Sequence, residues 1–163
     1  MKRIAAILLA LSLLLLTCGC IDRQDMPFNG KVSFYDIEVT VPDRFVRDSF
    51  SSTDEMWIFE YDRYSEYILI YAAESSSASS PHSGLEKYMN TMLSRNAESE
   101  IIPFLDREAV ISSYYKEDLY CREIFFYHNG YAYSVALRGG TDEAFAEIAD
   151  SIKIADETNL SKE

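Results

Sequence analysis

The sequence predicts an α+β fold, in which a mainly antiparallel sheet of about six strands carries a helix on each face, as an α/β/α sandwich. Segments of strand length with alternating or two-sided apolar character recur between residues 31 and 138. Two segments with apolar residues at helical spacing, 83–95 and the stretch after Thr141, supply the helices. The Asn129-Gly130 pair is typical of a two-residue turn, which joins antiparallel neighbours.

The first strand is predicted over residues 31–41 and ends at Pro42-Asp43. Its apolar residues alternate with more polar ones, and the alternation places on one face Tyr35, Ile37, Val39 and Val41. One apolar face and one mostly polar face are typical of a strand near the edge of a sheet.

A β-hairpin is predicted next, with strands at 56–61 and 67–73 around a five-residue loop. We expect Tyr61 to lie opposite Tyr67 in this hairpin. Both faces of the two strands are apolar, so we expect other parts of the chain to cover the hairpin on both sides.

The first helix is predicted over residues 83–95, after a Ser-rich surface loop at 75–83. Ser83 and Glu86 have the spacing of a capping box, in which each side chain bonds a backbone amide at the helix start. The second helix begins after Thr141, whose hydroxyl can accept a hydrogen bond from the first turn. The buried stripe of this second helix consists of Phe145, Ile148, Ala149 and Ile152.

The region between the helices is predicted to form the rest of the sheet. Its strands are expected at 98–104, 108–115, 119–128 and directly after the Asn129-Gly130 turn. The turn places Cys121 opposite Arg138, with Glu123 on the diagonal. The sequence therefore predicts a small polar cluster of these three side chains.

These features together resemble a known family. The strand ending in Val41-Pro42, the central hairpin, the Ser-rich loop into an amphipathic helix and a closing helix resemble the PsbP/DcrB-like superfamily over most of residues 31–155. The closing helix has the form Phe145-x-x-Ile148-x-x-Ser151-Ile152-Lys153. The resemblance implies an accessory or binding role without a shared active site, and several members are lipoproteins. It assigns a function to no particular residue.

The N-terminal segment has the order of a secretory signal. A basic start at Met1–Arg3 precedes an apolar run at Ile4–Leu16 and the small residues before Cys20. The run is shorter than the roughly 20 residues that a membrane-spanning helix needs. The small residues ending in Cys resemble the lipobox of bacterial lipoproteins, which implies a signal peptide at 1–19 and a lipid anchor on the following cysteine.

Two cysteines, Cys18 and Cys20, are candidates for the lipid attachment site. Gly19 precedes Cys20 and meets the requirement for a small residue, whereas the bulkier Thr17 precedes Cys18. Leu15, three residues before Cys18, favours the other choice. We expect the acyl group on Cys20. The alternatives are Cys18, a secreted protein cleaved near Gly19, and a short uncleaved anchor.

Lipidation at this cysteine divides the chain into four parts. Residues 20–30 form a lipidated tether, 31–155 a single α+β domain, and 156–163 a flexible tail. Attachment by acyl chains predicts a place on the outer face of the bacterial cytoplasmic membrane.

The composition of the chain excludes several classes of function. The formal net charge is −12, which argues against nucleic acid and against electrostatic docking on anionic lipid. Hydrophobic residues make up 48% of the chain, which argues against disorder of its bulk. The partner that we expect is another protein of the cell envelope.

The sequence carries no recognisable catalytic or metal-binding motif. It lacks a Gly-rich phosphate loop, a HExxH segment and a Gly-x-Ser-x-Gly elbow. His82 and His128 lack the spacing of metal ligands, so no cofactor and no metal site are predicted. Cys121 is interpreted as a buried structural residue. The alternative is a nucleophile whose thiol pKa Arg138 lowers.

The twelve tyrosines are the most unusual feature of the composition. Tyr64, in the middle of a hairpin loop, and Tyr115, next to Tyr114, are the candidates for contact with a partner. The other interpretation is that the tyrosines fill a two-sided core. The leading hypothesis is a lipid-anchored, non-enzymatic accessory domain that presents an acidic, Tyr-bearing surface to an envelope protein. The alternatives are a small-molecule or glycan binder with a cleft between sheet and helix, and a hydrolase that uses acidic residues.

Overall fold

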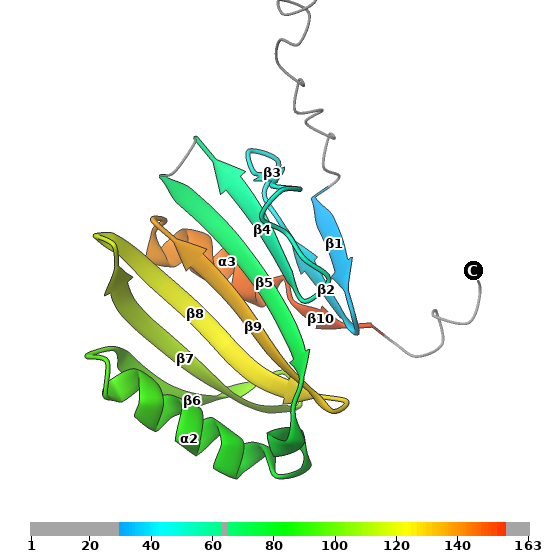
Figure 1. The fold of residues 1–163 in the computed structure, drawn as a ribbon, viewed down its shortest axis with the longest axis vertical. Helices are drawn as coiled ribbons and strands as arrows, with labels where there is room; N and C mark the ends of the chain where they lie inside the picture. Colours follow the sequence, from blue (N-terminus) through cyan, green and yellow to red (C-terminus); the bar gives the residue numbers. More distant parts are fainter. Residues whose placement is uncertain (1–29, 63–64, 156–163) are drawn as a thin grey trace, which may run out of the picture.

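The computed structural model describes residues 30–62 and 65–155 (Figure 1). In this part of the chain a large antiparallel sheet separates one helix on its first face from a second helix and a small sheet on its other face. The predicted α+β class, with a helix on each face, is therefore confirmed.

The large sheet has seven strands in the order β3-β4-β5-β9-β8-β7-β6. Every neighbouring pair is antiparallel. The strands are β3 (Val46–Arg47), β4 (Met56–Tyr61), β5 (Glu66–Glu74), β6 (Glu98–Phe104), β7 (Arg107–Lys116), β8 (Leu119–His128) and β9 (Tyr131–Arg138). Asn129 and Gly130 form the turn between β8 and β9, both at positive φ, as their sequence predicts.

The small sheet corrects the prediction of one strand at 31–41. This segment is a hairpin of β1 (Lys31–Phe34) and β2 (Ile37–Thr40), and β10 (Lys153–Ile154) pairs with β2. The chain turns at Tyr35, whose φ of 51° lies in the region that glycine favours. The buried residues change phase at the turn, from Val32 and Phe34 to Ile37 and Val39, whereas the apolar Tyr35 continues the alternation of the second strand and gives the sequence the pattern of a single strand. As a result Tyr35 is 40% exposed instead of sharing the buried face.

The β4–β5 hairpin has a register one residue away from the predicted one. Tyr61 lies opposite Glu66, not opposite Tyr67. A shift by one residue exchanges the faces of one strand relative to the other. Phe59 and Ile68 are consequently paired on one face, where both are fully buried. The expected cover on both sides is wrong for the second face, which is only half buried.

Helix α2 (Pro81–Leu93) begins two residues before the predicted start, with a short 3-10 turn η1 (Ser76–Ser79) ahead of it. Ser83 therefore lies inside the helix, and the predicted capping box does not form. Gly84 lets the helix approach the sheet, because a Cβ there would come within 2.7 Å of the Tyr127 ring. Leu85 packs with Val110 of the sheet to form a small apolar cluster.

Helix α3 (Asp142–Asp150) begins as predicted. Thr141 accepts a hydrogen bond through its hydroxyl from the amide of Ala144 at 3.2 Å. Phe145 and Ile148 are buried against the large sheet and the β1–β2 hairpin. The main core therefore lies between the large sheet on one side and α3 with the small sheet on the other. No helix of the described residues is long and apolar enough to cross a membrane.

Candidate functional site

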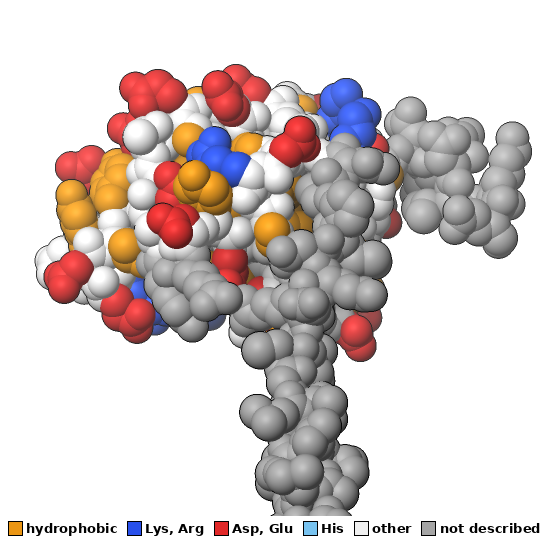
Figure 2. Space-filling model, turned by 90° about the horizontal axis from the view of Figure 1, so that it is seen from above, with side chains coloured by type: hydrophobic (Ala, Val, Ile, Leu, Met, Phe, Trp, Pro, Cys, Tyr) orange, Lys and Arg blue, Asp and Glu red, His pale blue; other side chains and the backbone are white. Residues whose placement is uncertain are grey.

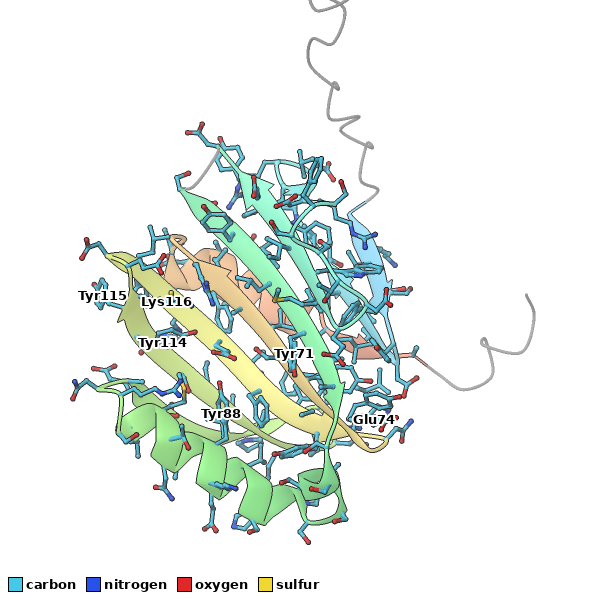
Figure 3. All side chains as sticks on the ribbon, in the orientation of Figure 1. Tyr71, Glu74, Tyr88, Tyr114, Tyr115 and Lys116 are labelled. Carbon is cyan, nitrogen blue, oxygen red and sulfur yellow. The ribbon has the colours of Figure 1, made fainter. Side chains whose placement is uncertain are left out.

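The two faces of the large sheet differ in how far the chain covers them. The face toward α3 and the small sheet carries the main core, and we call it the closed face. On the opposite face α2 contacts β6, β7 and β8, and among residues 30–62 and 65–155 no comparable layer lies above the surface of β4, β5 and β9 (Figure 3). We call this second surface the open face. Its side chains are Ile58, Tyr67, Leu69, Tyr71, Glu123, Ser134, Ala136 and Arg138.

Apolar and aromatic groups form the part of the open face farthest from α2. Ile58 lies opposite Leu69 across β4 and β5, and Leu69 lies opposite Ala136 of β9. Ile58 and Leu69 are half-buried, and Tyr71 in the next row is 37% exposed. Large apolar side chains thus lie side by side on a sheet surface that the described residues cover only in part.

A carboxylate tied to hydroxyl groups lies next to this apolar part. Glu123 accepts hydrogen bonds from the Tyr114 hydroxyl at 3.0 Å and from the Ser134 hydroxyl. Burial, followed by the charge of Glu123, raises the pKa of Tyr114 and that of Tyr88 on α2. Both phenols therefore stay protonated and able to donate. Figure 3 shows Tyr88 and Tyr114 on the same side of the sheet as Tyr71.

Arg138 is the charged neighbour of this cluster, yet it takes no part in it. Its guanidinium makes no hydrogen bond and no ion pair with any residue that the structure describes, and its Nε is fully buried. The Tyr114 and Ser134 hydroxyls, and not Arg138, contact the two oxygens of Glu123, so the predicted cluster of Cys121, Glu123 and Arg138 forms only in part.

Cys121 is a structural residue. It is fully buried and its thiol donates to the Leu119 carbonyl at 3.4 Å. Burial raises the pKa of this thiol, and the nearby charge of Arg138 opposes that rise without reversing it. A buried thiol with a raised pKa is a poor nucleophile, so the alternative of an Arg138-activated nucleophile is not supported.

Arg122, on the closed face, is also half-buried, but unlike Arg138 it has polar partners. Arg122 Nη1 lies 3.3 Å from the Asp142 carboxylate and 3.4 Å from the Tyr120 hydroxyl. Its guanidinium also lies 5.6 Å from the centre of the Phe145 ring. Like Arg138, it has a buried Nε without a hydrogen bond. This arginine therefore ties α3 to the sheet.

Two open hollows are lined mostly by polar residues. One, of about 330 Å³, lies beside Arg122 and includes Glu98, Glu100 and Ser113. The other, of about 510 Å³, lies at the β8–β9 turn and includes Glu74. Neither lies between α2 and the sheet, where the glycan-binding hypothesis expects a cleft with converging aromatic residues.

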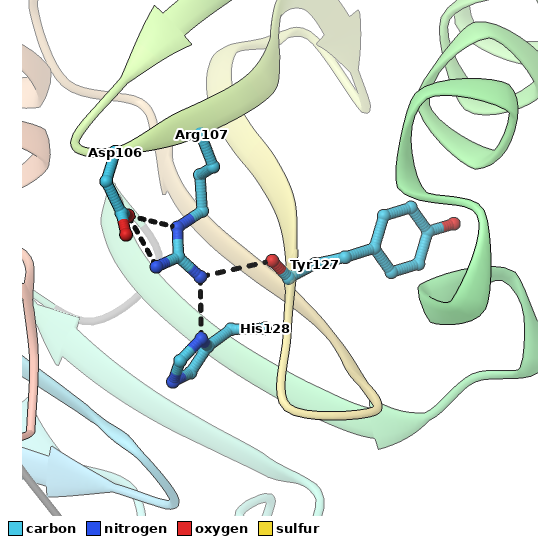
Figure 4. A network of polar contacts seen from close by, with 4 residues as sticks. All are labelled: Asp106, Arg107, Tyr127 and His128. Atoms are coloured by element: carbon cyan, nitrogen blue, oxygen red, sulfur yellow. Dashed lines mark hydrogen bonds and ion pairs between the residues drawn. The ribbon is translucent and has the colours of Figure 1, made fainter.

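Both histidines make local polar contacts. Arg107 lies 2.6 Å from Nδ1 of His128 and 2.8 Å from the Asp106 carboxylate (Figure 4). His82 contacts Glu108 at 2.7 Å, and this contact raises the pKa of His82. Within the described ranges, no group of three or more His, Cys, Asp or Glu side chains is arranged to hold a metal ion.

The carboxyl groups give no support to the hydrolase hypothesis. A catalytic acid needs a raised pKa. Hydrogen bonds from Arg107 lower the pKa of Asp106, and backbone amides at the start of α3 lower that of Glu143. Hydrogen bonds from Ser51 and the backbone also lower the pKa of Asp48, although burial opposes them.

The predicted site residues do not come together on the open face. Tyr115 is 76% exposed, but its side chain projects to the side opposite Tyr114 and contacts Tyr120 at 5.4 Å between ring centres. Tyr64 and Cys20 lie outside the described residues. Sequence reasoning missed the open face because it expected both sides of the β4–β5 hairpin to be covered. The apolar character of Leu69 was visible, but its lack of cover was not.

The chain is similar to known proteins in structure and not in sequence. No family model matches the sequence, and no curated protein matches it. A solution structure of cyanobacterial PsbP (CyanoP) from Synechocystis sp. PCC 6803 aligns with a TM-score of 0.50 and 13% identity. The alignment covers 85% of this chain and 99% of that one. The chain has a PsbP-like fold.

A second solved structure supports the same fold. A crystal structure from Bacteroides thetaiotaomicron VPI-5482 aligns with a TM-score of 0.57 and 12% identity over 81% of this chain. The chain spans about half the length of that protein, since the alignment covers 51% of it. At sequence identities this low, similarity to these structures shows the fold of the chain and not its function. The function has to be argued from the residues on its surface.

Proposed function

We propose that this chain is a lipid-anchored, non-enzymatic accessory domain of the bacterial cell envelope, and that its open face binds a protein partner. The observation that carries the proposal is the partly exposed group of Ile58, Leu69 and Tyr71 on a sheet whose other face carries the main core. Uncovered apolar surface of this kind marks interaction sites.

The composition of the open face suits contact with a protein. Tyrosine and arginine are enriched among the residues that contribute most to binding at interfaces, and this face carries Tyr71 and Arg138 beside aliphatic groups. Half-buried strands side by side give a partner a broad surface instead of a small-molecule pocket. A partner that covered Leu69 would remove the rest of its apolar surface from water, which favours association.

The proposed anchor explains how a strongly acidic domain stays at a membrane. Figure 2 shows Asp and Glu side chains over much of the surface in that view, with Lys and Arg in few places. Such a surface is repelled by anionic lipid. Two acyl chains on Cys20 supply attachment without a basic patch. Residues 20–30 span at most about 40 Å when fully extended, so the domain would search for partners close to the bilayer.

In-cell photo-cross-linking tests the proposal. The photoreactive residue p-benzoylphenylalanine replaces Tyr71 on the open face or, as the control, Glu147, which is exposed on α3. We expect a discrete cross-linked product from position 71 and none from position 147. Leu69→Arg should abolish the product, because a charge would then lie in the apolar row. The same product from both positions, or none from position 71, would contradict the proposal.

The predicted contact residues are tested in the same experiment. Placing the photoreactive residue at Tyr64 or Tyr115 shows whether the partner reaches them. Cys20→Ala addresses the anchor separately, since it should move the chain from the membrane to the soluble extracytoplasmic fraction. Retention of the Cys20→Ala chain in the membrane would contradict lipid anchoring at that residue.

A further inference from the structure

We propose that Arg138 is a receptor for a carboxylate on the partner, supplied by an acidic residue with apolar neighbours. This inference rests on the proposed function, because it names the chemistry that the open face recognises. It is carried by the state of Arg138, a half-buried guanidinium without a hydrogen bond or ion pair among the described residues.

The other half-buried arginines of the described chain show what is missing at Arg138. Arg107 bonds the Asp106 carboxylate through two nitrogens. Arg122 pairs with Asp142. Buried or partly buried charges are ordinarily paired, because leaving water without a partner is costly. Arg138 is half-buried like these two arginines but has no carboxylate partner among the described residues. It can therefore accept a carboxylate from another molecule.

A carboxylate close to Arg138 on the sheet, that of Glu123, is hydrogen-bonded to other residues. Glu123 lies on the diagonal from Arg138 across β8 and β9. Its oxygens are occupied by the hydroxyls of Tyr114 and Ser134. The Tyr114 and Cys121 groups respond to the charge of Arg138, which lowers the pKa of each against the effect of burial. The positive charge of Arg138 thus remains available to an external anion.

The surroundings of Arg138 favour a single carboxylate in an apolar setting. Tyr67 lies directly opposite Arg138 across β5 and β9, and Leu69 lies on the diagonal. Lys116, exposed at the end of β7, adds a second positive charge near Cys121 (Figure 3). A guanidinium fork matches the two oxygens of a carboxylate. The net charge of −12 repels surfaces dense in phosphate, so we place the anion on an acidic side chain of a protein.

The test follows the Nε–H signal of Arg138 by NMR, using the full chain labelled with ¹⁵N-arginine in a neutral detergent. Burial of Nε protects this proton from exchange, and Arg138→Gln assigns the signal by its loss. Two peptides serve as probes, acetyl-Leu-Glu-Leu-amide and its neutral match acetyl-Leu-Gln-Leu-amide. Inorganic phosphate is the third probe, and the Arg122 signal is the internal control.

We expect the Glu peptide to shift the Arg138 signal saturably, with an affinity at least about fivefold higher than that of the Gln peptide. The Arg122 signal should stay in place. No shift, or equal shifts with the two peptides, would overturn the inference. A shift with phosphate alone would overturn it in favour of a phosphate site.

The cross-link from position 71 separates this inference from the proposed function. If the partner docks through Arg138, Arg138→Gln should reduce the cross-linked product at least about fivefold, whereas Arg122→Gln should leave it unchanged. An unchanged product in Arg138→Gln would overturn the carboxylate receptor and leave partner binding intact. Absence of any product from the unaltered face would contradict the proposed function, and the peptide titration would still decide the role of Arg138.

Discussion

Ile68 and Leu69 are neighbours on β5 and similar in size, yet they belong to different environments. Ile68 faces α3 and the small sheet and is fully buried. Leu69 faces the open side and is half-buried. Both faces of the central strands are therefore apolar, but the described residues supply a full layer for only one. The proposed binding of a partner rests on this difference.

Arg122 and Arg138 show the same difference between the two faces, here for charged side chains. Arg122 on the closed face has a carboxylate, a hydroxyl and an aromatic ring as partners. Arg138 on the open face has none of these among the described residues. On the closed face the arginine has a carboxylate partner within the fold, and on the open face the arginine has none among the described residues.

The largest expected effect is the difference between Ile68→Ala and Leu69→Ala. Ile68→Ala should lower the free energy of unfolding by about 2–5 kcal/mol, because it leaves a cavity in the packed core. Leu69→Ala should cost less, about 1–2 kcal/mol, because Leu69 is only partly buried and its loss leaves a surface depression instead of an enclosed cavity. Chemical denaturation of the full chain in detergent measures both. Equal losses would mean that the open face is packed as tightly as the core.

The next effect compares Arg122→Met with Arg138→Met. Arg122→Met should destabilise the domain by about 1 kcal/mol, because it removes the ion pair with the partly exposed Asp142. Arg138→Met should leave stability unchanged or raise it by about 0.5–1 kcal/mol, since a charge without a partner is replaced by an apolar group. Thermal unfolding of the two variants decides. A large loss in Arg138→Met would reveal a partner for Arg138 within the chain.

The hydroxyl cluster predicts a loss of stability in alkali. Burial raises the pKa of Tyr88 and Tyr114 above the value of about 10 in the unfolded chain. Above that pH the unfolded state has lost protons that the folded state keeps, so the free energy of unfolding falls as pH rises. Tyr114→Phe should weaken this dependence above pH 10. The same slope in Tyr114→Phe and the parent would contradict the assignment.

The smallest effect concerns Cys121. Because its thiol is buried and its pKa is raised, a thiol reagent should not label it in the native domain. Labelling should appear only in denaturant. A Cys18→Ala/Cys20→Ala chain isolates the signal. Rapid labelling of the native form would restore the interpretation of Cys121 as a reactive group.

Local pattern was enough to predict most of the fold. The Asn129-Gly130 turn fixed the β8–β9 register, including Cys121 opposite Arg138, because such a turn leaves one pairing. Thr141 predicted the start of α3. The failures are at turns without a strong signal. Tyr35 turns the chain at a positive φ that its sequence does not indicate, and the loop after Tyr61 is one residue shorter than predicted.

The candidate site was harder to predict, since it depends on what is absent above a surface. Exposure of Tyr115 could be inferred from its place beside Tyr114. The partial exposure of Leu69 could not be inferred, because an apolar residue at this position is equally typical of a strand that is covered on both sides. Nor could the isolation of Arg138, because sequence places Glu123 within reach of it but does not show that hydroxyls occupy that carboxylate.

Hydroxyl-radical footprinting tests most directly whether the open face is a partner surface. Oxidation of Tyr71 is compared between the purified chain and the chain in its native membranes, with Leu105, 54% exposed at the β6–β7 turn, as the reference. If a partner covers the open face, Tyr71 should be protected several-fold in membranes relative to Leu105. Equal oxidation of Tyr71 in both preparations would show that nothing covers this face and would contradict its role in binding.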